Sequence, residues 1–446
     1  AEAEAEAEEE TERWGAVREL RISLLPSSIG TSTSNNNSTN NSSSSAGVAL
    51  YEDSIEQASA ALASLLPGVR RVQFGGVATN LFSRELFGQL AGFYSAQLSA
   101  IKSLHPITVH PDTVFRRLAS ASIHYDGRAG YRAPRMDPCC LVSLSLAGWP
   151  ANHSWAPFSA DGSAAATIEF PRLRTLNVRY TYNHHHADSG PAAQSPGGGG
   201  GGHHQWKKKR LSFPALRKIR VECAEMSCPI LEYMVLPPQM DSVAIDVAAP
   251  ALLSLHEAAL PIARSVKIGI THGARHDRSV LAAANRILTR VRGHEGAELD
   301  VYDSSLPVTP ESITCASLTG LLVSAPTSVD AMLGLIQALP SLASLWISHL
   351  TAGEPQTDIS IPEPGDARLA EPLNTSIEHM SIDARGNERP EDAVVPVAKY
   401  LLLKIPTLAS FNAIQLPRQA IEDFVGAYSE LYPHLAIIRF RLSNRS

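Results

Sequence analysis

The sequence is poor in cysteine and contains no long apolar run. The five cysteines among 446 residues are few and odd in number, and their spacing does not match a disulfide framework. They are Cys139, Cys140, Cys223, Cys228 and Cys315. We therefore expect a reducing intracellular compartment, cytoplasmic or nuclear. No apolar run approaches the roughly 18 residues that cross a bilayer, so we expect no membrane partner.

A strong net charge is also lacking once the first residues are set aside. The formal net charge is −6, but residues 1–12 (AEAEAEAEEETE) contain seven glutamates, so the remainder is close to neutral. A nearly neutral body argues against an obligate nucleic-acid binder, whose binding face is normally basic. We expect residues 1–12 to form a solvated acidic tail and expect no nucleic-acid partner.

The usual enzyme signatures are missing: the sequence has no GxSxG elbow, P-loop, GxGxxG, HExxH or paired CxxC. We therefore expect no enzyme and assign no catalytic residue, cofactor or metal. One cluster, THGARHD, has the residue types of an acid–base or metal site, namely His272, His276 and Asp277. A loop-built enzyme site at these three residues is the alternative. Asp277 is better explained as support for the N-terminus of a following helix, where a carboxylate is favoured.

Two stretches read as disordered insertions, residues 26–47 and residues 183–210. The first is dominated by Ser, Thr and Asn, and the second contains six consecutive glycines. Histidines of the second stretch (184–186, 203 and 204) suit zinc or copper, but a glycine-rich loop without nearby carboxylates favours low-complexity expansion. Its basic end, Lys207–Arg210, is typical of a solvated loop edge. The alternative is a nuclear or nucleic-acid-associated factor that uses this segment.

A nine-residue phrase occurs six times: apolar, Pro, any, apolar, two free positions, apolar, free, apolar. The copies are LPGVRRVQF, FPRLRTLNV, FPALRKIRV, LPSLASLWI, IPTLASFNA and YPHLAIIRF, starting at residues 66, 170, 213, 339, 405 and 432. Pro stops a preceding helix, and the alternating apolar pair starts a buried strand. A relaxed pattern, apolar-x-x-apolar-x-apolar, finds further candidate strands. Successive starts are then ordinarily about 22–35 residues apart, which indicates a repeat architecture.

The segments between the phrases change along the chain. Amphipathic patterns predict helices over residues 52–65, 83–93, 280–291, 328–338, 391–404 and 418–430. Between roughly residues 105 and 270 no convincing amphipathic helix is expected. A strand followed by a crossover segment and then another strand predicts that the two strands pair in parallel.

Segments such as FPRLRTLNV resemble those of irregular leucine-rich-repeat proteins, especially the fungal and plant F-box/LRR-like kind. The resemblance covers Val17 to Phe440. It implies an α/β fold: a curved LRR-like solenoid with one long parallel sheet, and convex-side helices in the N- and C-terminal parts. Residues 13–446 would form this single solenoid. The chain lacks the Asn or Cys that follows each strand in regular repeats, and no F-box is visible, so the family's adaptor-binding role is not carried over.

Outward strand positions are the candidate binding surface. In the phrase the last two apolar residues point inward, so their neighbours point outward. Trp346 at such a position is typical of an interface anchor or of a side chain that covers a neighbouring strand or loop. Basic residues would add a mildly positive stripe or an ordinary solvated face. The candidate partner-binding residues are Arg179, Lys218, Arg220, Lys267, Trp346, His379 and Arg439. We expect a monomeric interaction scaffold for a protein partner; the resemblance also suggests substrate recognition in a ubiquitin-ligase receptor.

Overall fold

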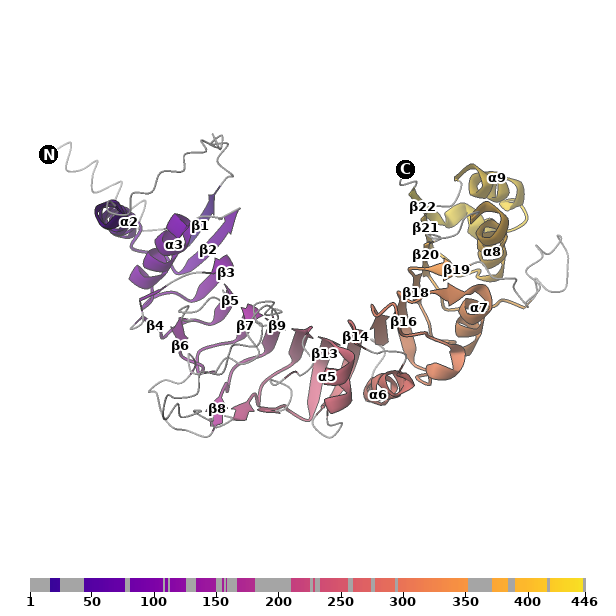
Figure 1. Cartoon of the computed structure of the whole chain (residues 1–446), viewed down its shortest axis with the longest axis horizontal. Coiled ribbons are helices and arrows are strands. Elements are labelled where there is room, and N and C mark those ends of the chain that lie inside the picture. The colour runs from indigo at the N-terminus through magenta and orange to yellow at the C-terminus, as the bar shows by residue number, and fades with distance from the viewer. Residues whose placement is uncertain are drawn as a thin grey trace, which may run out of the picture. The chain divides into compact units, whose positions relative to one another are not determined.

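The structure is a computed structural model, and its helices and strands are shown in Figure 1. It describes residues 17–24, 44–76, 81–106, 109–110, 113–125, 134–149, 155, 158, 167–180, 210–224, 228, 233–255, 260–273, 277–292, 296–351, 371–383, 390–414 and 418–443. The acidic residues 1–12 lie outside this set. So do the expected insertions, apart from residues 44–47 and Arg210, which begin a helix and a strand.

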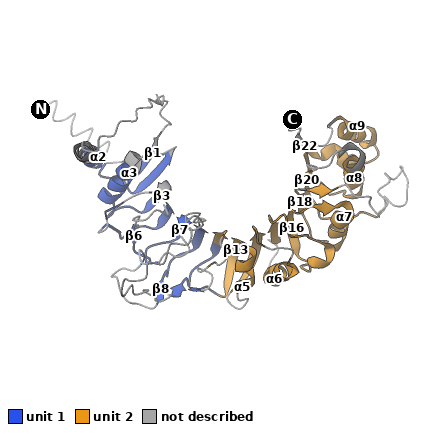
Figure 2. Cartoon of the chain, viewed as in Figure 1, with its two compact units in different colours: residues 1–219, 233–237 blue, residues 220–232, 238–446 orange. Residues whose placement is uncertain are grey.

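The chain divides into two compact units (Figure 2). Unit 1 contains residues 1–219 and 233–237, and unit 2 contains residues 220–232 and 238–446. Each unit is treated by itself below. The single solenoid over residues 13–446 therefore stays a prediction.

The fold is α/β with a long, open parallel sheet whose strands are hydrogen-bonded in chain order. The strands of unit 1 are β1 (Glu19–Leu24), β2 (Arg71–Gly76), β3 (Ala100–Pro106), β5 (Ser120–His124), β7 (Ser143–Trp149) and β9 (Thr175–Tyr180). β11 (Lys218–Cys223) has residues in both units. The strands of unit 2 are β13 (Gln239–Val247), β14 (Ile262–Ile270), β15 (Ala297–Val301), β16 (Leu318–Val323), β18 (Ser344–Ile347), β20 (His379–Asp383), β21 (Ser410–Ile414) and β22 (Arg439–Ser443). The predicted parallel pairing is confirmed.

The helices also agree with the sequence pattern. They are α2 (Ser44–Leu65), α3 (Leu81–Phe93), α5 (Ala249–Ser254), α6 (Arg278–Leu288), α7 (Val329–Ala338), α8 (Pro390–Lys404) and α9 (Arg418–Tyr428). Among the described residues between 105 and 270 the longest helical segment is the six-residue α5, in agreement with the expected lack of amphipathic helices. Figure 1 shows α5 to α9 on one side of the strands of unit 2. The apolar side of α6 packs on β14 and β15 there.

Short parallel strands replace the helices where helices are scarce. In unit 1, β8 (Thr167–Glu169), β10 (Arg210–Ser212) and β12 (Met234–Val235) form a three-stranded sheet, and β4 (Val114–Phe115) pairs with β6 (Arg135–Met136). In unit 2, β17 (Thr327–Ser328) pairs with β19 (Leu350–Thr351). Phe170 and Phe213 stack at 5.0 Å between ring centroids next to the three-stranded sheet. This contact explains why two copies of the phrase begin with phenylalanine.

The proline of the phrase serves a tight turn in the described copies. In each copy the first residue accepts a hydrogen bond from the N–H three residues later, as Leu339 O does from Leu342 N at 3.1 Å. Proline then occupies the second turn position, which its fixed φ suits. The expected helix stop is correct where α2, α7 or α8 precedes the proline. It is wrong at Phe170 and Phe213, because β8 and β10 precede them and the turn alone explains the proline.

Each strand therefore has a packed face and an open face. The phrase residues predicted to point inward are buried, as Leu345 and Ile347 are in β18. The residues that alternate with them form what we call the open face. In unit 1 the open face of β5, β7 and β9 is mostly uncharged and small: Ser120, Ser122, Ser143, Ser145, Thr175 and Asn177.

Candidate functional site

The open face of unit 2 contains a continuous row of residues in register on neighbouring strands. The row, named here the Asp246–Asn412 row, consists of Asp246, Gly269, Asp300, Leu322, Trp346, Ser381 and Asn412. Neighbouring strands lie about 4.8 Å apart, so alternate members are separated by about 10 Å. The row differs in chemistry from the open face of β5, β7 and β9, because it combines two carboxylates, an indole and an amide.

Lys267 lies beside the row and joins two carboxylates of β15. Its Nζ is 2.6 Å from Asp300 Oδ2 and 3.0 Å from Glu298 Oε2. Burial alone would lower the pKa of Lys267, but hydrogen bonds to Asp300 and Glu298 raise it above its usual value. The Tyr302 hydroxyl also donates to Asp300 Oδ2, at 3.0 Å. Lys267 is therefore held protonated over β15.

Asp246 is the least compensated carboxylate of this region. It is 9% exposed, and Arg220 Nη2 is 3.6 Å from its Oδ2 while Arg220 Nε is 2.8 Å from Glu222 Oε1. Among the described residues, Asp246 Oδ1 has no hydrogen-bond donor. Burial raises the pKa of Asp246, and the charge of Arg220 opposes that effect. The ionised form of this side chain is therefore short of positive charge.

A glycine explains how the Asp246 carboxylate lies on the sheet. Gly269 is its register partner, and a Cβ on Gly269 would be 2.0 Å from Asp246 Oδ1. The carboxylate thus crosses β14 towards β15. Glu298 lies in the same way over Gly320, where an added Cβ would be 3.0 Å from its Cγ. Because Gly269 and Gly320 have no side chain, the two carboxylate side chains lie flat against the sheet instead of projecting from the open face.

Two aromatic side chains are exposed in this part of unit 2, namely Tyr302, which bonds to Asp300, and Trp346. Trp346 and Tyr302 are each 45% exposed, which is high for rings of this size. Trp346 lies two strands from Asp300, with Leu322 between them in register. An indole as exposed as this one is suited to binding rather than to core packing.

The structure brings some of the predicted residues together and leaves others apart. Arg220 and Lys267 lie in the network just described, and His379 and Arg439 are exposed on the open face in the register row below Trp346. Arg179 and Lys218 are exposed in unit 1. Arg220 and Lys267 are each paired with carboxylates, and whether the basic residues form a positive stripe or an ordinary solvated face stays a prediction.

The residues that sequence reasoning missed are Asp246, Asp300 and Tyr302. Asp246 follows the last apolar residue of its phrase copy, Ile245, and β13 continues to Val247. Strand length, rather than the phrase itself, was the signal that could have found this carboxylate. Before β15 the position that is apolar in the phrase is Gly296, which has a left-handed φ of 91°, so the phrase is hard to recognise there.

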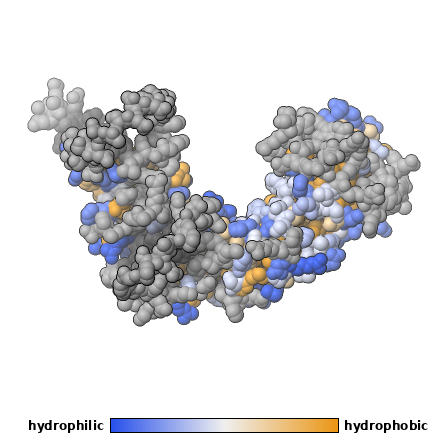
Figure 3. Space-filling view, in the orientation of Figure 1, coloured by the Kyte–Doolittle hydropathy of each residue, from blue (hydrophilic) through white to orange (hydrophobic). Residues whose placement is uncertain are grey.

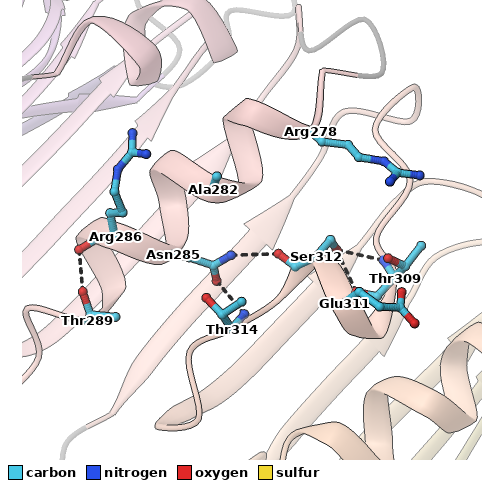
Figure 4. Close-up of a pocket in the computed structure, with 9 residues that line it drawn as sticks. All are labelled: Arg278, Ala282, Asn285, Arg286, Thr289, Thr309, Glu311, Ser312 and Thr314. Atoms are coloured by element: carbon cyan, nitrogen blue, oxygen red, sulfur yellow. Dashed lines mark hydrogen bonds between the residues drawn. The ribbon is translucent and has the colours of Figure 1, made fainter.

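A separate pocket of about 670 Å³ lies between α6 and the residues that follow β15 (Figure 4). Asn285 donates to Ser312 O at 2.7 Å and accepts from Thr314 N at 3.2 Å, so its amide holds the pocket wall together. Arg278 lines the pocket near Glu311, whose pKa is lowered mainly by a backbone hydrogen bond. These groups stabilise the wall, and the Ser312 hydroxyl in it donates to Thr309 O at 2.7 Å and accepts from Thr309 N at 2.9 Å.

The THGARHD cluster has local structural roles where it is described. Asp277 caps α6 by accepting from Ser279 N at 2.8 Å, and hydrogen bonds from the side chain and the backbone of Ser279 lower the pKa of Asp277. His272 Nδ1 is 3.0 Å from Thr271 Oγ1. His276 lies outside the described residues. The helix cap predicted for Asp277 is confirmed.

The other candidates have little structure to report. The five histidines of residues 184–204 and the lysines of residues 207–209 lie outside the described set. Within the described part of the chain no group of three or more His, Cys, Asp or Glu side chains could hold a metal ion. All five cysteines are free thiols, and Cys223 and Cys228 are buried.

The surface, the helices and the comparisons add three findings. In Figure 3 hydrophilic and hydrophobic residues are interspersed over the coloured part of unit 2 that this view shows. None of the helices that the structure describes combines the length and apolar character of a membrane span. No protein-family model matches the sequence, and a search of curated proteins gives no match.

Proposed function

We propose that this protein is a non-enzymatic interaction scaffold, an LRR-like solenoid that presents the open face of unit 2 to a protein partner. The observation that carries the proposal is the Asp246–Asn412 row, where exposed Trp346 lies in register with a charged, hydrogen-bonded surface. The repeated turn of the phrase supports the LRR-like part of the proposal. We further propose that the protein is monomeric and intracellular, in the cytoplasm or the nucleus.

The arrangement matches the anatomy of an interface. A large exposed aromatic ring supplies an anchor, while the ion pairs around Lys267 supply a polar rim with fixed geometry. The small hydroxyl residues on the open face of β5, β7 and β9 offer no comparable anchor. Trp346, Tyr302 and Asp300 are therefore the residues we expect to contribute most to binding.

Affinity purification from cells with the tagged full chain tests the proposal. Recovery of each captured protein is compared between wild type, Trp346→Ala and Arg220→Glu. Ile437→Ala is the matched control, because Ile437 is also exposed and apolar but lies on a 3-10 segment, Pro433–Ile437. We expect at least one protein to be lost from Trp346→Ala and kept by Ile437→Ala. Equal recovery by all variants would contradict the proposal.

Substrate recognition for a ubiquitin ligase is the narrower form of this function, suggested by the sequence resemblance. It predicts that an adaptor of such a ligase is recovered with the same bait. Because the row and the adaptor site would be different surfaces, Trp346→Ala should keep the adaptor while it loses the substrate. Recovery of a partner without any adaptor would reject this narrower form and keep the scaffold.

A further inference from the structure

The acidic half of the Asp246–Asn412 row indicates what kind of partner fits it, and this inference rests on the proposed function. Three carboxylates lie on β13 and β15 in this half of the row, from Asp246, Glu298 and Asp300, and their ion pairs come from Lys267 and from Arg220, which also pairs with Glu222. The local charge is therefore negative. Positive charge from a partner would complement it.

The need for positive charge is greatest at Asp246. Its Oδ1 has no donor among the described residues, and its ion pair with Arg220 is long, at 3.6 Å. A buried carboxylate with incomplete compensation is costly, so a cation that approaches its exposed side on binding would stabilise the complex. Asp300, two strands away, already accepts from Lys267 and Tyr302 and is 7% exposed. It offers a second point of negative charge at a fixed distance.

The aromatic rings specify how that cation is held. Tyr302 bonds to Asp300, and Trp346 lies two strands further along the row. A lysine ammonium or arginine guanidinium above Asp300 can reach a ring face, where the ring quadrupole attracts it. Carboxylate and aromatic ring together select a cationic side chain over a neutral one.

The spacing selects the backbone that carries the cations. Asp246, Asp300 and Trp346 lie on alternate strands, so they recur about every 9.6 Å. A polyproline II segment repeats a side chain on the same face every three residues, or about 9.3 Å. A β-strand places side chains on the same face about every 6.8 Å, which does not match the spacing of about 9.6 Å along the row. Because Gly269 and Gly320 have no side chain, they leave room for the backbone of a partner segment that crosses the strands.

We propose that the row binds a polyproline II-type segment of a partner protein, with lysine or arginine at every third position over Asp246 and Asp300 and an apolar residue over Trp346. The segment crosses the strands rather than extending the sheet. Its charge and spacing, rather than a defined sequence, are what the row recognises.

Fluorescence anisotropy with labelled synthetic peptides and the full chain tests this inference at low salt. The probe carries lysine at every third position of a proline host and ends in leucine. One control peptide replaces each lysine with glutamate, and another places the same lysines at every second position of a serine host. We expect the probe to bind about tenfold more tightly than either control and to weaken as salt is raised. Equal binding of the glutamate peptide or of the serine-host peptide would overturn the inference.

Variants locate the binding on the row. Asp246→Asn and Trp346→Ala should each weaken the probe about tenfold, whereas Glu430→Gln and Ile437→Ala should leave it unchanged. Asp246→Asn removes an under-compensated buried charge, so it is expected to fold. If Asp246→Asn and Trp346→Ala both bound the probe peptide as tightly as the wild type, the inference would be overturned. If a cellular partner is still lost from Trp346→Ala while the probe fails to bind, this inference fails and the scaffold function stands.

Discussion

The carboxylate of Asp246 lies directly across Gly269, so closely that a Cβ on Gly269 would be 2.0 Å from Asp246 Oδ1 and 3.3 Å from Asp246 Cα. Gly269→Ala should therefore destabilise unit 2 by about 1–3 kcal/mol through overpacking. Chemical denaturation followed by circular dichroism measures the change. The second substitution Asp246→Ala should recover most of the loss, because it removes the clashing carboxylate.

Gly426→Ala is the matched control, since an added Cβ on Gly426 meets nothing within 4 Å. Gly426 lies inside α9, where alanine stabilises a helix by up to about 1 kcal/mol relative to glycine. If Gly269→Ala behaved like Gly426→Ala, the close approach of Asp246 would be wrong.

Lys267 should stabilise the sheet through its two carboxylates. Lys267→Gln removes the ion pairs and leaves the buried Asp300 with the Tyr302 hydroxyl. Because Lys267 is about one-third exposed, we expect a loss of roughly 1–2 kcal/mol, less than for a fully buried pair. Arg264→Gln on the exposed side of the same strand should change the stability by less than about 0.5 kcal/mol. Similar losses from both substitutions would show that the network does not stabilise the fold.

Asp246 should make stability depend on pH. Burial raises its pKa in the folded protein above the unfolded value, so the folded state keeps this proton at a pH where the unfolded chain has lost it. The contribution of the group is complete below the unfolded pKa and is lost as the pH rises through the folded pKa. Asp246→Asn should thus gain stability relative to wild type between acidic and neutral pH, by roughly 1 kcal/mol. A constant difference across that range would contradict the shift.

Asn374 should contribute more to the free energy of unfolding than an asparagine with a single side-chain hydrogen bond. Its Nδ2 donates to Ile336 O and Leu339 O at 3.0 and 3.1 Å, and its Oδ1 accepts from Ser376 N and Ile377 N at 2.7 and 3.1 Å. This buried amide ties the end of α7 to the start of β20. Asn374→Ala leaves buried backbone groups without partners and should cost about 2–4 kcal/mol in thermal or chemical unfolding.

Asn412→Ala is the control for Asn374→Ala, because Asn412 makes one side-chain bond, to Ser381 Oγ at 3.0 Å, and is partly exposed. It should cost less than about 1 kcal/mol. Equal effects of the two substitutions would contradict the anchoring role of Asn374.

The repeated phrase and its relaxed copies predicted most strands of the long sheet and their buried faces, because proline and alternating apolar residues are local signals, but they missed β3 and the short strands outside that sheet. It also placed Trp346 on the open face correctly. The partners of Arg220 and Lys267 were not predictable in this way. Asp246 and Asp300 lie on other strands, and only the register of the sheet brings them close. The aromatic stack of Phe170 and Phe213 is likewise a tertiary feature that the phrase suggests but does not specify.

Hydroxyl-radical footprinting of the full chain, alone and with its purified partner, tests the central claim most directly. In the free protein Trp346 and Tyr302, each 45% exposed, should be oxidised readily, as should Ile437, which is 73% exposed. With the partner bound, we predict that oxidation of Trp346 and Tyr302 falls several-fold while that of Ile437 stays unchanged. Unchanged oxidation of both rings in the saturated complex would contradict the claim that the open face of unit 2 binds the partner.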